Sequence, residues 1–126
     1  MERGFVASPR ADAAVADLAL ALARSMKLGS GKAPDILSVS FSATDYIGHG
    51  YGTEGAEMCI QMAELDRTVG RLLAGIDALG VDYAVVLTAD HGGLDLTERL
   101  DQQALPAASR ATAELLPARL SEAVKE

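Results

Sequence analysis

Both histidines of the chain lie close to an aspartate in a glycine-rich stretch. Asp45 precedes His49 by one helical turn's length of sequence, and Asp90 directly precedes His91. Neutral imidazole and carboxylate are usual protein ligands of zinc and related divalent ions. Two such ions about 3.5–4 Å apart can hold the attacking and leaving oxygens of a displacement at phosphorus. The residue types therefore predict metal binding, provided that the fold brings the two Asp-His pairs together.

Each Asp-His pair follows a stretch that predicts a β-strand. Residues 83–87 are apolar at every position, which is typical of a strand buried on both faces of a parallel sheet. Residues 35–41 follow a proline and contain β-branched and aromatic side chains, so they predict a second strand. Glycines at alternate positions disfavour a continuous helix over residues 42–52, and we expect a loop there.

A long amphipathic helix is predicted between the two strands. From Thr53 to Leu79 apolar residues recur every three or four positions, and Gly80 ends the pattern. Strand, helix and strand would form a βαβ unit, whose strands run parallel through a right-handed crossover. Both Asp-His pairs would then lie at the same edge of the sheet, where open α/β sheets bind ligands.

The other segments predict helices at both ends of the chain. We expect a terminal helix over residues 109–124 and a first helix over residues 12–28, whose apolar positions are Val15, Leu18, Leu22 and Met26. The predicted fold class is α/β, a parallel βαβ core of a doubly wound sheet with flanking helices. Residues 1–126 would form a single partial domain, with its core at about 10–93 and a helical tail at about 94–126.

Composition narrows the classes of function. The chain has 126 residues, of which 49% are hydrophobic, so it can build a packed core. Its formal net charge of −7 argues against a nucleic-acid partner, although metal ions would let an acidic chain bind an anionic substrate. No apolar run approaches the roughly 20 residues of a membrane span, and the first residues do not resemble a signal peptide. We therefore expect neither a nucleic-acid nor a membrane partner, and we interpret the single cysteine, Cys59, as a packing residue.

Two features have ordinary structural interpretations. Residues 29–32, Gly-Ser-Gly-Lys, lack the first glycine and the final hydroxyl residue of a phosphate-binding loop, and they follow a helix instead of a strand. We interpret them as a flexible loop. The Asp-His pairs also have an alternative, in which Asp45 caps a turn, His49 packs under Tyr51, and Asp90 caps the segment after its strand. Periodicity does not choose between this alternative and a metal site.

The combined motifs resemble the metal-binding half of the alkaline phosphatase superfamily. Residues 45–49 read Asp-x-x-Gly-His, and about forty residues later residues 88–92 read Thr-Ala-Asp-His-Gly. The nearest look-alikes are monomeric periplasmic alkaline phosphatases and type I phosphodiesterase/nucleotide pyrophosphatases. The resemblance covers about residues 5–93. It implies a metal-dependent phosphoric ester hydrolase in the periplasm or outside the cell.

The resemblance implies two zinc sites, each only partly built by this chain. Asp45 and His49 would hold one zinc with a histidine from later in the family's sequence. Asp90 and His91 would hold the other, with an upstream aspartate and a Thr or Ser nucleophile. In such enzymes the nucleophile forms a covalent phosphoenzyme that is then hydrolysed. Phosphoglycerate mutases, phosphopentomutases and sulfatases share the motifs, so the resemblance leaves the substrate open.

This chain departs from the family pattern because the upstream aspartate, the nucleophile and the later histidine have no counterparts. Neither Thr44 nor Thr88 is expected at a helix N-terminus, where the family nucleophile lies, so we predict no catalytic residue and no activity from this chain alone. We interpret the chain as a fragment of a larger alkaline-phosphatase-like domain, whose exposed sheet edges favour self-association. The alternatives are a non-catalytic module for metal binding, anion binding or assembly, and a piece of a related mutase or sulfatase.

Overall fold

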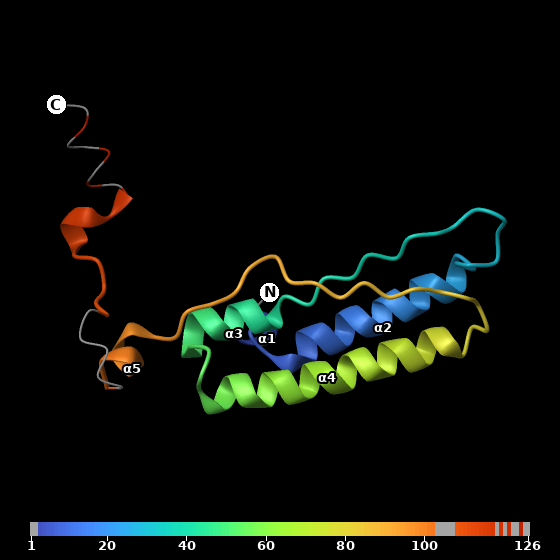
Figure 1. Ribbon diagram of the computed structural model, residues 1–126, viewed down its shortest axis with the longest axis horizontal. Coiled ribbons are helices and arrows are strands. Elements are labelled where there is room, and N and C mark those ends of the chain that lie inside the picture. Colours follow the sequence, from blue (N-terminus) through green and yellow to red (C-terminus); the bar gives the residue numbers. More distant parts are fainter. Residues whose placement is uncertain (1–2, 103–107, 118, 120, 122–123, 125–126) are drawn as a thin grey trace. The chain divides into compact units, whose positions relative to one another are not determined.

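Two long helices packed against each other form most of the first of two units of the structure. The computed structural model describes residues 3–102, 108–117, 119, 121 and 124, and the chain divides into two units, residues 1–94 and residues 95–126. The first unit contains α1 (Arg3–Val6), α2 (Pro9–Ser25), α3 (Ala43–Tyr51) and α4 (Ala56–Asp77). The main packing is between α2 and α4, and α3 packs mostly on α4 (Figure 1).

The first long helix, α2, buries a face of small residues. Pro9 occupies its first turn, where a missing N–H costs nothing. The buried positions recur every three or four residues and are Asp12, Ala16, Ala19 and Ala23. Small side chains allow α4 to approach closely, and a Cβ added at Gly75 of α4 would lie only 2.5 Å from Leu20 Cδ2. The close contact of α2 and α4 therefore depends on the small side chains of α2 and on the missing side chain of Gly75.

The predicted apolar face of this helix is not its buried face. The helix itself is confirmed, with bounds that differ by three residues at each end from those expected over residues 12–28. However, Leu18 is 59% exposed and Met26 is 65% exposed. Periodicity identified the helix, but it placed the core on the side of the large apolar residues. The structure places the core on the side of the alanines.

The helix predicted between residues 53 and 79 is confirmed as α4. Its N-cap is Gly55 instead of Thr53, and it ends before Gly80, which has a φ of +68°. A positive φ is the conformation in which a glycine commonly terminates a helix. Among the described helices, none combines the length and the apolar character that a membrane crossing would require.

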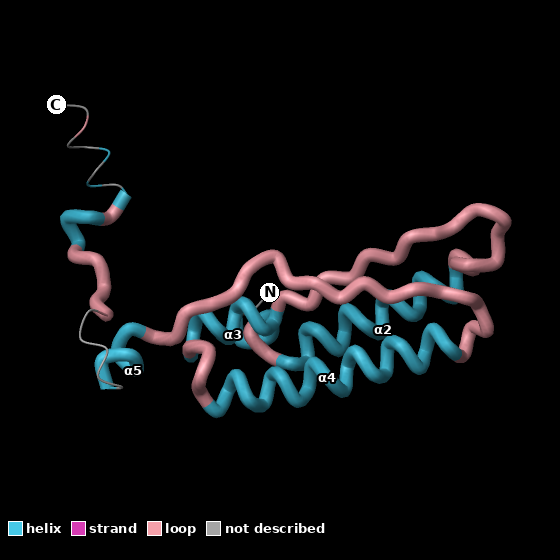
Figure 2. Tube along the Cα trace, viewed as in Figure 1, coloured by secondary structure: helices cyan, strands magenta, loops and turns pink. Residues whose placement is uncertain are grey.

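The predicted βαβ sheet is wrong for the described residues, which contain no strand. Residues 34–42 and 81–89 have no regular secondary structure, and Figure 2 shows both segments as loops. A strand buried on both faces needs neighbours that cover it, and an isolated pair of strands is only marginally stable in water. Here Ile36 is 91% exposed, and Val86 is 89% exposed. The apolar and β-branched composition predicted strands, but nothing in the described parts of the chain covers these two side chains.

The loop predicted over residues 42–52 is also wrong, because most of it forms the helix α3. Burial explains how the helix tolerates its glycines. Ala43 and Ile47 are 1% and 3% exposed, and a Cβ at Gly48 would lie 3.6 Å from Met58 Cε on α4. Tertiary packing therefore outweighs the low helix propensity of glycine in this segment.

The second unit contains α5 (Thr97–Gln102) and a short 3₁₀ turn, Ala113–Leu115. Asp95 is buried and accepts hydrogen bonds from the Arg99 guanidinium at 2.7 and 2.9 Å. The Arg110 guanidinium hydrogen-bonds the Glu98 carboxylate and lowers its pKa to about 2. Of the terminal helix predicted over residues 109–124, residues 118, 120, 122 and 123 lie outside the described part of the chain, and the rest includes the 3₁₀ turn.

Candidate metal centre

Asp45 and His49 lie on one face of α3. His49 follows Asp45 by four positions, so their side chains lie one above the other along the helix. His49 Nε2 is 3.4 Å from Asp45 Oδ1, and the two side chains are 78% and 46% exposed. The local geometry of α3, which the sequence did not predict, thus aligns the first Asp-His pair.

Asp90 and His91 follow the extended segment 81–89 and lie beside the first pair. His91 Nε2 is 3.4 Å from Asp90 Oδ2 and 3.9 Å from Asp45 Oδ1. The backbone N–H of His91 also donates to Asp90 Oδ1 at 3.1 Å, which fixes the carboxylate beside its neighbour. One carboxylate, that of Asp45, therefore lies close to both imidazoles of the chain.

The orientation of the His91 ring suits a ligand at Nε2. His91 Nδ1 lies 2.8 Å from the Gly92 carbonyl oxygen, which accepts only, so this nitrogen carries a proton and donates it. In the neutral ring Nε2 is then the unprotonated nitrogen that faces the two carboxylates. The Gly92 carbonyl, followed by the negative charges of Asp90 and Asp45, raises the pKa of His91 above 6.5.

Within each Asp-His pair, the donor atoms have the types and the spacing of two ligands on a tetrahedral divalent ion. Ligand atoms at about 2.0–2.1 Å from a tetrahedral zinc lie about 3.3 Å from one another. Two of the observed contacts, His49 Nε2 to Asp45 Oδ1 and His91 Nε2 to Asp90 Oδ2, are 3.4 Å long. Nevertheless, no group of three or more such side chains in the described parts of the chain is arranged to hold an ion by itself. Each pair offers two ligands of the four that a zinc site needs.

Buried polar residues that the sequence reasoning missed hold α3 in place. Asp12 of α2 accepts hydrogen bonds from the Ala43 backbone N–H at 3.1 Å and from Gln61 Nε2 of α4 at 2.8 Å. Gln61 Nε2 also donates to Thr44 Oγ1 at 3.1 Å. An aspartate in a first helical turn and a glutamine in a long helix are common on helix surfaces, so local sequence gave no signal for this cluster.

The position of Thr44 corrects one expectation. It was expected outside a helix, but it lies in the first turn of α3. Its hydroxyl accepts the hydrogen bond from Gln61, so it joins α3 to α4. Thr88 is in the extended segment, and its hydroxyl donates to the carbonyl of Ala89 at 3.2 Å.

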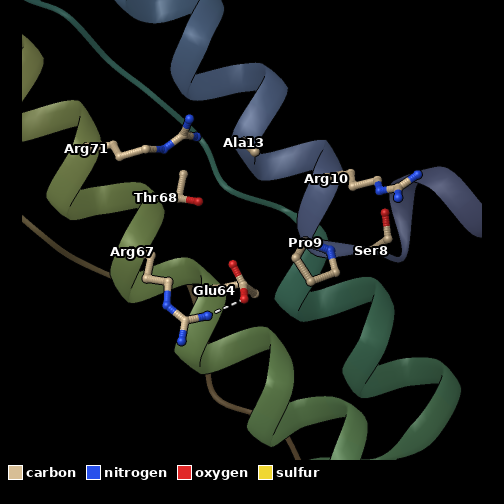
Figure 3. Close-up of a pocket in the computed structure, with 8 residues that line it drawn as sticks. All are labelled: Ser8, Pro9, Arg10, Ala13, Glu64, Arg67, Thr68 and Arg71. Carbon is tan, nitrogen blue, oxygen red and sulfur yellow. Dashed lines mark hydrogen bonds and ion pairs between the residues drawn. The ribbon is translucent and has the colours of Figure 1, made fainter.

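A separate groove of about 550 Å³ lies between α2 and α4, and none of the four predicted ligands lines it (Figure 3). Three arginines line it, namely Arg10, Arg67 and Arg71. Arg67 pairs with Glu64 inside the groove, and Arg71 Nη1 is 3.5 Å from Asp17 Oδ1. These exposed ion pairs compensate much of the positive charge that the arginines bring to the groove.

The chain belongs to the type I phosphodiesterase / nucleotide pyrophosphatase family, whose family model matches residues 4–114. This match and the relatives described next place it in the alkaline phosphatase superfamily, and the resemblance drawn from the motifs is thereby confirmed. The matched region includes both Asp-His pairs and the helices between and before them.

Several curated proteins are similar to most of the chain. Alkaline phosphatase PhoD of Zymomonas mobilis is 50% identical over 117 residues, which cover 93% of this chain and 20% of that protein. Alkaline phosphatase PhoK of a Sphingomonas species is 45% identical over 124 residues, which cover 98% of this chain and 22% of that protein. Venom phosphodiesterase 2 of Crotalus adamanteus is 32% identical over 82 residues, covering 63% and 10% respectively. The chain thus spans about a fifth of the length of the two alkaline phosphatases.

Proposed function

We propose that this chain carries part of the two-zinc site of a phosphoric ester hydrolase. The observation that supports this most directly is the position of Asp45 Oδ1, which lies 3.4 Å from His49 Nε2 and 3.9 Å from His91 Nε2. Both imidazoles therefore lie near that atom, and the Asp90 carboxylate lies 3.4 Å from the imidazole of His91. The family of the chain supports phosphoric ester hydrolysis as the reaction, because its relatives include alkaline phosphatases and phosphodiesterases.

The residues of this chain act as ligands in the proposal. Asp45 and His49 hold one zinc, and Asp90 and His91 hold the second. Bound divalent ions polarise a phosphoryl oxygen and activate an oxygen nucleophile. The Gly92 carbonyl keeps the His91 proton on Nδ1, which leaves Nε2 available to a metal. The remaining ligands and the nucleophile come from parts of the enzyme that this chain does not contain.

Zinc titration of the 126-residue chain, followed by calorimetry, tests the ligand assignment. We expect binding no tighter than micromolar, because each site has two protein ligands, and we expect His91→Ala and Asp45→Ala to weaken it. Asp66→Ala is the matched control, since Asp66 is an exposed aspartate on α4 outside the cluster. Zinc binding that is the same in His91→Ala, Asp45→Ala and the control would refute the assignment.

The absence of a nucleophile is tested with an aryl phosphate substrate. We expect no turnover by the chain alone at any zinc concentration, because each proposed site lacks ligands and the hydroxyls of Thr44 and Thr88 are engaged in hydrogen bonds with Gln61 and Ala89. Turnover that disappears in Thr44→Val or Thr88→Val would overturn it and identify the nucleophile. The substrate class that follows from the family is a phosphate ester.

Self-association is the second part of the proposal. The extended segments 34–42 and 81–89 expose apolar side chains, including Leu87, which is 81% exposed. Extended backbone outside a sheet also keeps N–H and C=O groups available for pairing. We expect concentration-dependent sedimentation of the chain, reduced by Val86→Lys. A monomer at all concentrations would exclude this role for the segments.

A further inference from the structure

The N-terminus of α3 is capped by a residue from a different helix. Its own N-cap residue, Ser42, makes no capping hydrogen bond through its side chain. Instead the Ala43 N–H donates to Asp12 Oδ1 of α2 at 3.1 Å. Asp12 is only 2% exposed, so this carboxylate is held inside the protein against the positive end of the α3 dipole.

Gln61 of α4 joins Asp12 to the first turn of α3, and we call Asp12 and Gln61 together the clamp. It is fully buried, and its Nε2 donates both to Asp12 Oδ2 at 2.8 Å and to Thr44 Oγ1 at 3.1 Å. Consecutive residues of the first turn of α3 are thereby tied to α2 and to α4. A buried carboxylate is stable only when hydrogen bonds satisfy it, so its position is set by all its partners at once.

The clamp leaves Asp45 available for another purpose. An acidic residue at the third helical position often turns back to bond the N-terminal backbone of its own helix. In α3 the carboxylate of Asp45 lies beside His49 and His91 instead, at 3.4 and 3.9 Å. Because Asp12 caps the helix, the carboxylate of Asp45 is not required for capping.

We propose that Asp12, together with Gln61, is a positioning residue for the metal ligands carried by α3. Asp12 touches neither histidine, and it acts by fixing the first turn of the helix on which Asp45 and His49 lie. The inference rests on the proposed function for the role of those two ligands. The part that concerns the geometry of α3 does not depend on bound metal.

Amide hydrogen exchange of the metal-free chain, read by NMR, tests the positioning role. In Asp12→Ala we expect exchange in α3 to rise about fivefold, the factor of a typical lost helix cap, and exchange in α2 and α4 to stay unchanged. Asp17→Ala is the matched control, because it removes an exposed aspartate from the same helix and should leave α3 unchanged. Equal rates in α3 of both variants would refute the inference, as would a uniform rise in all three helices.

The conservative variant Asp12→Asn distinguishes the role of the side-chain oxygen as a hydrogen-bond acceptor from the role of the negative charge. Asparagine keeps an oxygen for the Ala43 N–H, and its amide nitrogen can donate to Gln61 Oε1 once the Gln61 amide turns over, since that oxygen has no partner among the described residues. We therefore expect Asp12→Asn to restore slow exchange in α3, and rates as high as in Asp12→Ala would contradict the capping role. If Asp12→Ala does not fold, Gln61→Leu replaces it: a selective rise of exchange in α3 supports the clamp, and unchanged rates refute it.

Zinc affinity, measured by competition with a chromogenic chelator, tests the link to the metal site. We expect Asp12→Ala to bind zinc more weakly than Asp17→Ala does. Equal affinity of the two variants would show that the clamp does not serve the ligands. If the unaltered chain binds no zinc, the proposed function is wrong, and the exchange rates still decide whether Asp12 positions α3.

Discussion

The isoleucines at positions 47 and 36 allow a direct test of which apolar residues form the core. Ile47, on α3, is 3% exposed, whereas Ile36, in the extended segment before α3, is 91% exposed. Replacing each by alanine removes the same atoms. The chemistry of the change is therefore constant, and only the surroundings differ.

The expected effects differ about tenfold. Truncating a buried isoleucine to alanine costs about 2–5 kcal/mol, and we expect the lower part of this range, about 2–3 kcal/mol, because α3 lies on one side of α4 and can settle into the space. Ile36 buries about a tenth of its surface, and a fully buried side chain of this kind contributes about 1.5–3 kcal/mol, so Ile36→Ala should cost about 0.2 kcal/mol.

Urea denaturation followed by circular dichroism measures both variants against the unaltered chain. A lower midpoint with an unchanged slope reports lost stability in the folded state. If Ile36→Ala were as destabilising as Ile47→Ala, the extended segment would be buried in solution. That result would refute the assignment of the core to the three helices.

Three further predictions concern glycines, a phenol and metal binding. Gly80→Ala should destabilise the chain by about 1 kcal/mol, because a left-handed φ of +68° is costly for alanine. Gly70→Ala should stabilise it by about 0.5–1 kcal/mol, because Gly70 lies inside α4 with open space for an added Cβ. Thermal unfolding compares the two variants, and equal shifts in their melting temperatures would contradict the backbone argument. The pKa of Tyr83 should lie above 10.0, because its hydroxyl donates to Asp77 Oδ1 at 2.6 Å. Asp77→Asn should lower this pKa, which an absorbance titration measures in a variant whose other tyrosines are phenylalanine. An unchanged pKa would refute the hydrogen bond. Zinc affinity should fall as the pH drops from about 8 to 5. The fall should start above pH 6.5, because His91 has a raised pKa and binds metal only when its imidazole is neutral. Calorimetry that shows the same zinc affinity over this pH range would argue against histidine ligands.

The helices were predictable from sequence to different degrees. The pattern of α4 is strong because its apolar residues recur over a long stretch, and its existence follows from periodicity alone. The pattern of α2 gave the helix but the wrong buried face, since Leu18 is exposed and Ala19 is buried. A hydrophobic side chain marks a face that can be buried, whereas close packing of two helices here selects the face with the smallest residues.

The four candidate ligands were chosen from the sequence, and their binding of metal stays a prediction. Asp45, His49, Asp90 and His91 were identified from residue type and spacing, because metal coordination by imidazole and carboxylate depends on the side chains themselves. The prediction that a common sheet edge brings these residues together is wrong for the described residues, which contain no strand. Their contacts arise from a helix on one side and an extended segment on the other.

The sequence by itself determined which segments are strongly helical, which side chains have the chemistry of metal ligands and which family the motifs resemble. These properties are local, because they depend on neighbours within a few positions along the chain. Only the tertiary structure decided that residues 43–51 form a helix despite their glycines, since the cap is supplied by Asp12 and the burial by α4. The convergence of both histidines on the Asp45 carboxylate also depends on contacts between distant parts of the chain, and no local pattern records them.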